Sequence, residues 1–449
     1  MPSRFRLTLA LLLLIALGAG AQELTITDYT LPNGLRVVLN PDDAAPLVAV
    51  NLWYHVGSAN ERPGRTGFAH LFEHMLFSGS EHVGNNEHFR YVQSVGGLLN
   101  GSTTFDRTNY FETVPAQYLP LALWLESDRM GWFLPALGQE KLDIQKQVVK
   151  EERRQRYDNV PYGTWIEDQL RLLFPAGHPY SWPTIGSMED LTAAQLPDVR
   201  EFFRTYYAPN NAVLTLAGNF DPAQARALVE KYFGPVPRGP EPPPVEAEID
   251  PLGGEKRRTI EATVQLPRVY RMYRVPPIRE EEWLVANLLA TILADGKASR
   301  LERALVVEQQ IAQNVAAFVW PSERASMLAM WISPKPGISP ERVETAADEV
   351  LQRLMAEGPT AEELERAKNV WKTDIAEEMS ELSSRADLLS MATTYFGDPR
   401  EALRFDDRAD AVTAADVQRV ARMVLDSDNR VTVTYVPRAA EETTGGGER

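Results

Sequence analysis

Histidines are few and clustered in this chain, and their spacing is the first feature that could support chemistry. The 449-residue sequence has six histidines, and five of them lie between residues 55 and 88. Two of the five belong to the run His70-Leu71-Phe72-Glu73-His74. This H-x-x-E-H pattern can supply two zinc ligands and a general base from one short stretch of helix. The spacing therefore predicts a metal site with hydrolytic chemistry.

The residues around this motif predict a helix that can present it. We expect the helix over residues 67–77, capped by Thr66. At about 100° per residue, His70, Glu73 and His74 share one face, while apolar side chains occupy the opposite face. Two imidazoles on one face can bind zinc, and Glu73 can accept a proton from a water molecule that the metal activates. Two core or surface histidines on an amphipathic helix are the alternative.

A hydrolytic zinc ion usually has a third protein ligand, which must come from elsewhere in the chain. A helical pattern over residues 138–157 carries the adjacent acids Glu151 and Glu152. On a helical wheel Glu152 points in the mean direction of the apolar side chains of this segment, and Glu151 lies about 100° away. A carboxylate among apolar side chains is costly unless it is paired or metal-bound, which favours Glu152 as the ligand. The alternative is an ion pair of Glu152 with Arg153, Arg154 or Arg156.

The composition narrows the possible functions. The chain has 46 lysines and arginines against 62 aspartates and glutamates, and this net charge of -16 disfavours nucleic-acid binding. It contains no cysteine, which excludes disulfides, thiol nucleophiles and cysteine-based metal sites. Any metal must therefore be held by histidines and carboxylates.

The first residues are typical of an export signal. Two arginines precede a short apolar run from Leu9 to Leu17, and small residues follow up to Ala21. We predict cleavage after Ala21 and a periplasmic location. No stable membrane insertion is expected, because the run is shorter than the roughly 20 residues that span a bilayer.

A proline-rich segment divides the rest of the chain into two halves. Seven prolines between residues 235 and 251 predict an extended linker. Each half begins with strand-like runs and continues with helical patterns, and the segments from Leu191 and Val412 resemble each other, which indicates a duplicated unit. We expect an α+β fold with two similar domains, each a largely antiparallel sheet packed with helices. The predicted boundaries are a signal peptide at 1–21, an N-terminal domain at 22–233, a linker at 234–254, a C-terminal domain at 255–438 and a disordered tail at 439–449.

Several segments resemble the pitrilysin or insulinase family of zinc peptidases, which carry the inverted H-x-x-E-H motif. They are HLFEHMLFSGS from His70, GGLLNGSTTFDRTNYFETVP from Gly96, VVKEERRQ from Val148 and, more loosely, GKASRL from Gly296. The resemblance implies that His70, His74 and Glu152 bind Zn²⁺ and that Glu73 is the catalytic base. In that family a further acid usually lies seven positions before the distal ligand, and Gln145 occupies that position here.

The resemblance also implies how substrate and partners are arranged. The strand matching residues 99–105 is expected to offer an open edge to an extended peptide, with Asn100 and Gly101 as substrate contacts. From spacing alone, Gly101 fits a bulge equally well. Single-length relatives form half of a clamshell chamber and work with a second, homologous chain. The C-terminal half has no histidine, so it cannot repeat the zinc site.

These features together predict a periplasmic zinc endopeptidase that hydrolyses peptides or unfolded protein segments. The rival interpretation is a non-catalytic assembly or peptide-binding subunit that keeps the fold without the chemistry. Of the remaining histidines, His82 and His88 are expected at the surface, His178 in a loop and His55 in a strand that borders the site.

Overall fold

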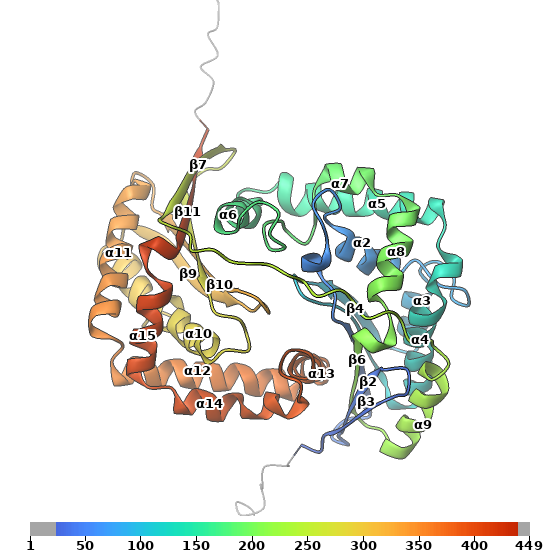
Figure 1. Ribbon diagram of the computed structural model, residues 1–449. Coiled ribbons are helices and arrows are strands. Elements are labelled where there is room, and N and C mark those ends of the chain that lie inside the picture. Colours follow the sequence, from blue (N-terminus) through green and yellow to red (C-terminus); the bar gives the residue numbers. More distant parts are fainter. Residues whose placement is uncertain (1–23, 439–449) are drawn as a thin grey trace, which may run out of the picture.

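The computed structural model describes residues 24–438 and shows two halves, each built on one β-sheet (Figure 1). The predicted signal peptide and C-terminal tail lie outside these residues. The strands of the N-terminal half are β1 (Thr27–Thr30), β2 (Arg36–Pro41), β3 (Leu47–Tyr54), β4 (Leu98–Thr103), β5 (Thr108–Pro115) and β6 (Ala212–Gly218). Its helices are α2 (Phe68–Met75), α3 (Glu87–Ser94), α4 (Leu119–Ala136), α5 (Gln139–Arg153), α6 (Trp165–Leu173), α7 (Met188–Ala193), α8 (Leu196–Tyr206) and α9 (Pro222–Phe233).

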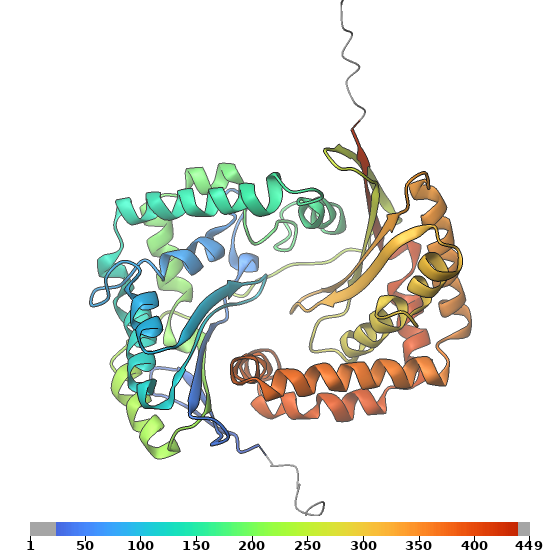
Figure 2. The same cartoon turned by 180° about the vertical axis from the view of Figure 1, so that it is seen from behind.

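The C-terminal half follows a segment, residues 234–255, that contains no helix or strand and crosses from one half to the other (Figure 2). Its strands are β7 (Lys256–Ala262), β8 (Arg268–Val275), β9 (Ala312–Trp320), β10 (Ser326–Pro334) and β11 (Arg430–Pro437). Its helices are α10 (Glu281–Ala294), α11 (Pro340–Glu357), α12 (Ala361–Ser380), α13 (Leu382–Met391), α14 (Phe405–Ala411) and α15 (Ala414–Val424).

The two sheets share one strand order. The N-terminal sheet reads β1-β2-β6-β3-β5-β4 and the C-terminal sheet reads β7-β11-β8-β10-β9. When β1 is left out and the strands of each half are numbered along the chain, both sheets have the order 1-5-2-4-3. In both sheets the first of these strands runs parallel to the last, and the remaining pairs are antiparallel. The predicted α+β fold and the predicted duplication are confirmed.

The strand order gives α2 a counterpart in the C-terminal half. Helix α2 lies between β3 and β4 in the chain, and α10 lies between the corresponding strands β8 and β9. Most side chains of α10 are apolar and buried, and the helix carries no histidine. The H-x-x-E-H motif is therefore confined to the N-terminal half.

Each half contributes one helix to the sheet of the other half. Helix α13 packs on β3 and β6, and α6 packs on β8 and β11 (Figure 1). Asp387 of α13 accepts hydrogen bonds from Asn51, Trp53 and Asn109 at 3.0, 2.7 and 2.7 Å. Tyr110, the neighbour of Asn109, instead reaches α2 through its hydroxyl group. Because side chains alternate along a strand, α13 and α2 cover opposite faces of the N-terminal sheet.

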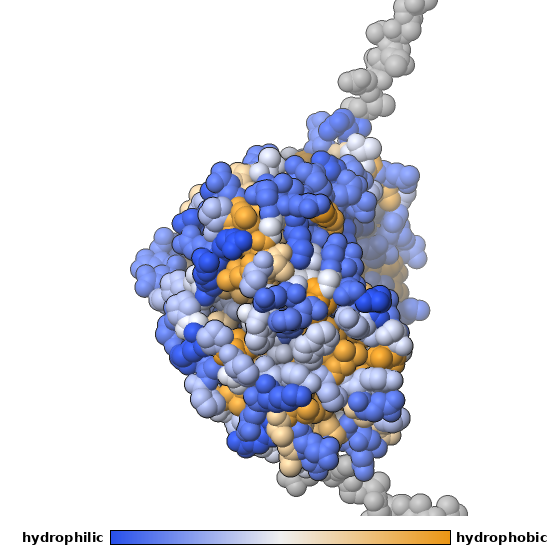
Figure 3. Space-filling model, turned by 90° about the vertical axis from the view of Figure 1, so that its right-hand side faces the viewer, coloured by the Kyte–Doolittle hydropathy of each residue, from blue (hydrophilic) through white to orange (hydrophobic). Residues whose placement is uncertain are grey.

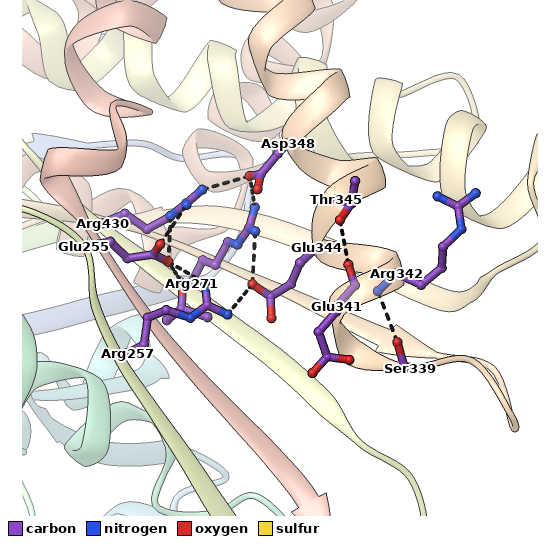
Figure 4. Close-up of polar contacts among 11 residues, drawn as sticks. Glu255, Arg257, Arg271, Ser339, Glu341, Arg342, Glu344, Thr345, Asp348 and Arg430 are labelled. Carbon is purple, nitrogen blue, oxygen red and sulfur yellow. Dashed lines mark hydrogen bonds and ion pairs between the residues drawn. The ribbon is translucent and has the colours of Figure 1, made fainter.

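A network of ion pairs fixes helix α11 to the C-terminal sheet (Figure 4). Buried Arg271 of β8 pairs with Asp348 at 2.7 Å and with Glu344 at 3.4 Å. Arg430 of β11 pairs with Asp348 at 2.8 Å, and Arg257 of β7 pairs with Glu344 at 2.6 Å. Glu344 and Asp348 thus place opposite charges beside the buried guanidinium group of Arg271, as its burial requires.

The outer face of the N-terminal half is mainly hydrophilic, with scattered apolar patches (Figure 3). Within residues 24–438, every helix is either too short or too polar to cross a membrane. Scattered apolar side chains on a hydrophilic surface are common in folded proteins.

Candidate metal centre

Helix α2 carries the H-x-x-E-H motif, and its first turn is held by the carboxylate of Glu61, which lies in the loop before the helix. Glu61 accepts hydrogen bonds from the backbone N–H groups of Gly67 at 2.9 Å and Ala69 at 2.8 Å. Gly67 has a φ of 86°, and an added Cβ would lie 2.8 Å from a backbone oxygen, so both conformation and space require glycine. The expectation that Thr66 caps this helix is wrong, because its hydroxyl donates to Asp190 at 2.6 Å instead.

The helix is shorter than its predicted span of residues 67–77, but its two faces lie as the wheel indicates. Its apolar face packs into the core through Phe68, Leu71, Phe72 and Met75. The histidines and Glu73 of the motif occupy the other face and are partly buried. Apolar packing thereby fixes the direction in which the polar face points.

Helix α5 carries Glu152, which lies 78 positions after His74 in the chain, and places it beside the two histidines. One carboxylate oxygen, Oε2, lies 3.0 Å from His74 Nε2 and 3.7 Å from His70 Nε2. The three potential ligand atoms all lie within 4.8 Å of one another. Ligands about 2.1 Å from a tetrahedral zinc ion are separated by about 3.4 Å, so two imidazoles and this carboxylate fit such an ion.

The neighbouring acid, Glu151, takes no part in this cluster. Its side chain is 54% exposed and pairs with Arg154, whereas that of Glu152 is 16% exposed. The second oxygen of Glu152 receives a hydrogen bond from Arg156 at 2.6 Å. Both alternatives predicted for Glu152 therefore occur together: Oε2 lies in the cluster with the histidines, and Oε1 pairs with Arg156.

The charges of the cluster suit metal binding. Burial, reinforced by the nearby charge of His74, lowers the pKa of His70 to about 4, so this imidazole is neutral at pH 7. Burial disfavours the charged form of Glu152, but its hydrogen bond with His74 outweighs that cost and lowers its pKa. Neutral imidazoles and an ionised carboxylate are the forms that zinc binds.

Glu73 lies beside this cluster and is held by the sheet beneath α2. Thr103 of β4 donates a hydrogen bond from its hydroxyl to Glu73 Oε2 at 2.6 Å. Burial raises the pKa of Glu73, and the hydrogen bond from Thr103 offsets only part of this effect. A carboxylate with a raised pKa is a better proton acceptor and donor near neutral pH.

Strand β4 forms one edge of the N-terminal sheet, and among the described residues it pairs only with β5. Asn100 is exposed on this strand, and its side chain accepts a hydrogen bond from the N–H of Gly101 at 2.9 Å. A Cβ added at Gly101 would lie 3.1 Å from side-chain atoms of both Glu73 and Phe77. Glycine here therefore lets α2 approach the strand closely.

The other four histidines lie outside the cluster. His55 contacts a carboxylate of the C-terminal half, Glu323, at 2.5 Å, and half-exposed His82 contacts a buried aspartate on α4 at 2.5 Å. The surface expectation for His88 is wrong, because α3 turns this side chain inward and buries it completely. His178 occupies a loop as expected, although it is buried and stacks on the ring of a neighbouring phenylalanine.

Sequence reasoning missed two residues that support the motif, Thr103 and Glu61. Thr103 is two positions from Gly101 and so lies on the same face of the strand. Once Gly101 is placed against α2, strand alternation alone identifies Thr103. No local signal identifies Glu61, because its partners depend on how the preceding loop folds.

Comparison with known families identifies the family of this chain. A model described as insulinase, peptidase family M16, matches residues 36–171. A model described as the peptidase M16 inactive domain matches residues 193–370. The two matches together cover well over half of the chain, and the first contains the H-x-x-E-H motif, Thr103 and Glu152.

Individual proteins give the same result. The zinc protease PqqE of Helicobacter pylori is 29% identical over 397 residues, which are 87% of this chain and 88% of that protein. A crystal structure of a protease from Helicobacter pylori has a TM-score of 0.87 at 27% identity and covers 92% of this chain and 100% of the other. The periplasmic protease PqqL from Escherichia coli shares the fold, with a TM-score of 0.75 and 19% identity over 93% of this chain and 48% of its own. This chain belongs to the insulinase family, peptidase family M16.

Proposed function

We propose that this protein is a zinc-dependent endopeptidase that hydrolyses peptides or unfolded protein segments. The observation that carries the proposal is the convergence of His70, His74 and Glu152 within 4.8 Å, with Glu73 on the same helix face. Relatives named as zinc proteases support it. The first three residues are the proposed zinc ligands and Glu73 is the proposed general base.

The side chains of the site suit a hydrolytic reaction. Zinc held there would lower the pKa of a water molecule and polarise the carbonyl group of the scissile bond. Glu73 accepts the proton of the attacking water and then donates it to the leaving amide nitrogen. Glu152 and the two histidines would hold the metal, and Arg156 binds the second oxygen of the Glu152 carboxylate and so orients it.

The open edge of β4 suits an extended substrate. A peptide that adds to this edge as a further strand uses the free backbone groups around Asn100 and Gly101. Strand addition requires an unfolded segment, so we propose peptides and unfolded proteins as substrates.

We also propose that the mature protein acts in the periplasm with a homologous partner chain. The sequence pattern of residues 1–21 supports export, and the solved relatives include a periplasmic protease. That relative is about twice as long, because this chain matches 48% of it. A second chain of this fold would supply the equivalent of its remaining half and enclose the site.

The change Glu73→Gln tests the proposal. We expect the purified variant to keep its zinc, because Glu73 is not a proposed ligand, while hydrolysis of a quenched peptide falls at least about a hundredfold. Metal analysis and peptide digestion, each with and without a homologous partner chain, measure both quantities. Equal turnover by the variant and the wild type would contradict the assignment of the base.

The same assay addresses the rival proposal, a non-catalytic assembly or peptide-binding subunit. The match of residues 193–370 to the inactive-domain model is the observation that favours it. A wild-type protein that binds zinc and peptide but shows no turnover with or without a partner would support this second function.

A further inference from the structure

We propose that Thr103 is a positioning residue that sets the orientation of the Glu73 carboxylate. This inference rests on the proposed function, in which Glu73 is the general base. Within residues 24–438, the Thr103 hydroxyl is the one hydrogen-bond donor to Glu73, at 2.6 Å from its Oε2 atom. The terminal torsion of a glutamate is broad, so a hydrogen bond to one oxygen is what selects one orientation of the carboxylate.

The direction of this hydrogen bond leaves the other oxygen of Glu73 free for water. An ionised carboxylate only accepts hydrogen bonds, so the Thr103 hydroxyl must donate. A second hydroxyl group, that of Thr108, lies 3.5 Å from the hydroxyl oxygen of Thr103. It donates its own proton to the backbone oxygen of Val56 at 2.8 Å. Thr103 is therefore committed to Glu73 Oε2, and Oε1 has no hydrogen-bond donor among the described residues.

The hairpin that carries Thr103 is anchored by the C-terminal half. Buried Asp106, in the turn between β4 and β5, accepts hydrogen bonds from the Tyr180 hydroxyl at 2.7 Å and from the backbone N–H of Glu323 at 3.0 Å. The ring of Phe105 packs against Trp320 with centroids 5.6 Å apart. Through this turn the half without a metal motif helps to hold the strand that orients Glu73.

The pair of variants Thr103→Val and Thr103→Ser separates the hydroxyl group from the rest of the side chain. Valine keeps the shape and removes the donor, so kcat should fall about ten- to a hundredfold, as expected for loss of a hydrogen bond to a charged group, while KM stays within about threefold. Serine restores the donor and should keep kcat within about threefold of the wild type. Zinc content should be equal in all three proteins, and Thr103→Ala replaces the valine variant if that variant fails to fold.

Crystal structures of the three zinc-loaded proteins provide a readout that does not depend on turnover. We expect the Glu73 carboxylate to hold one orientation in the wild type and the serine variant, and to turn or become disordered in the valine variant. Full activity of the valine variant, or equal losses in both variants, would overturn the role of Thr103. If the wild type shows no turnover, the proposed function fails, and the orientation of Glu73 alone then decides the inference: a carboxylate that stays in place in all three proteins refutes it.

Discussion

At the scale of single residues, the two oxygens of Glu152 have different partners. Oε2 faces His70 and His74, and Oε1 is bound by Arg156. The helical wheel selected Glu152 over Glu151, and the structure places Glu152 beside the histidines. The wheel assumed that the apolar side chains on the Glu152 side of the helix are buried. This is only half right, because two of them, Ile144 and Val148, are exposed. Glu152 is sheltered because α5 crosses α2, which spacing alone does not show.

This geometry gives a prediction that compares the two adjacent glutamates. Glu152→Ala removes a proposed ligand and should lower zinc affinity by more than about tenfold. Glu151→Ala removes an exposed carboxylate that pairs with Arg154, so zinc affinity should stay within about twofold of the wild type. Metal analysis after competition with a chelator measures both variants. Zinc loss in the Glu151 variant with retention in the Glu152 variant would reverse the ligand assignment.

At the scale of elements, the sequence predicts the existence and the faces of α2 better than its ends. The spacing of apolar and polar residues fixes which side chains share a face, and this is a local property. The cap is not local, because Glu61 reaches the first turn from a preceding loop and Thr66 is drawn away by Asp190. The same limit applies to α11, whose contact with the sheet depends on arginines from three different strands.

The ion pairs of α11 give a prediction for stability (Figure 4). Glu344→Ala removes one partner of Arg271, whose side chain is 1% exposed, and should lower the free energy of unfolding by about 3 kcal/mol. The control is Glu308→Ala, because Glu308 pairs with Arg303 at the surface and should contribute less than about 1 kcal/mol. Urea unfolding of both variants tests the difference. Equal, small losses would show that Asp348 alone satisfies Arg271.

At the scale of the whole molecule, the shared strand order explains why two sequence segments look alike. The segments from Leu191 and Val412 each contain a helix, α8 or α15, that precedes the final strand of its half. Helices α6 and α13 each pack on the sheet of the other half, and no local sequence pattern predicts this. The apolar face of a helix indicates that the face is buried, but it does not indicate which element covers it. The contacts between the β4–β5 and β9–β10 turns are hidden from sequence reasoning for the same reason.

Asp106 lies where the β4–β5 turn meets the C-terminal half, and the shift of its pKa makes the stability of the protein depend on pH. Burial raises its pKa from 3.8 to about 6, although the N–H of Glu323 and the hydroxyl of Tyr180 favour its charged form. The folded protein therefore holds a proton on Asp106 more tightly than the unfolded chain does. The resulting stability is fully present below pH 3.8 and is lost as the pH rises through about 6.

We predict that Asp106→Asn removes this pH dependence. A shift from 3.8 to about 6 corresponds to about 3 kcal/mol of stability between the two limits. Other groups with shifted pKa values, such as His70 and His178, titrate alike in both proteins, so the difference between wild type and variant over the interval from pH 5 to pH 7.5 isolates Asp106. Over this interval the wild type should lose stability relative to the variant as the pH rises, measured by urea unfolding at each pH. Parallel profiles for the two proteins would mean that Asp106 does not titrate in this interval.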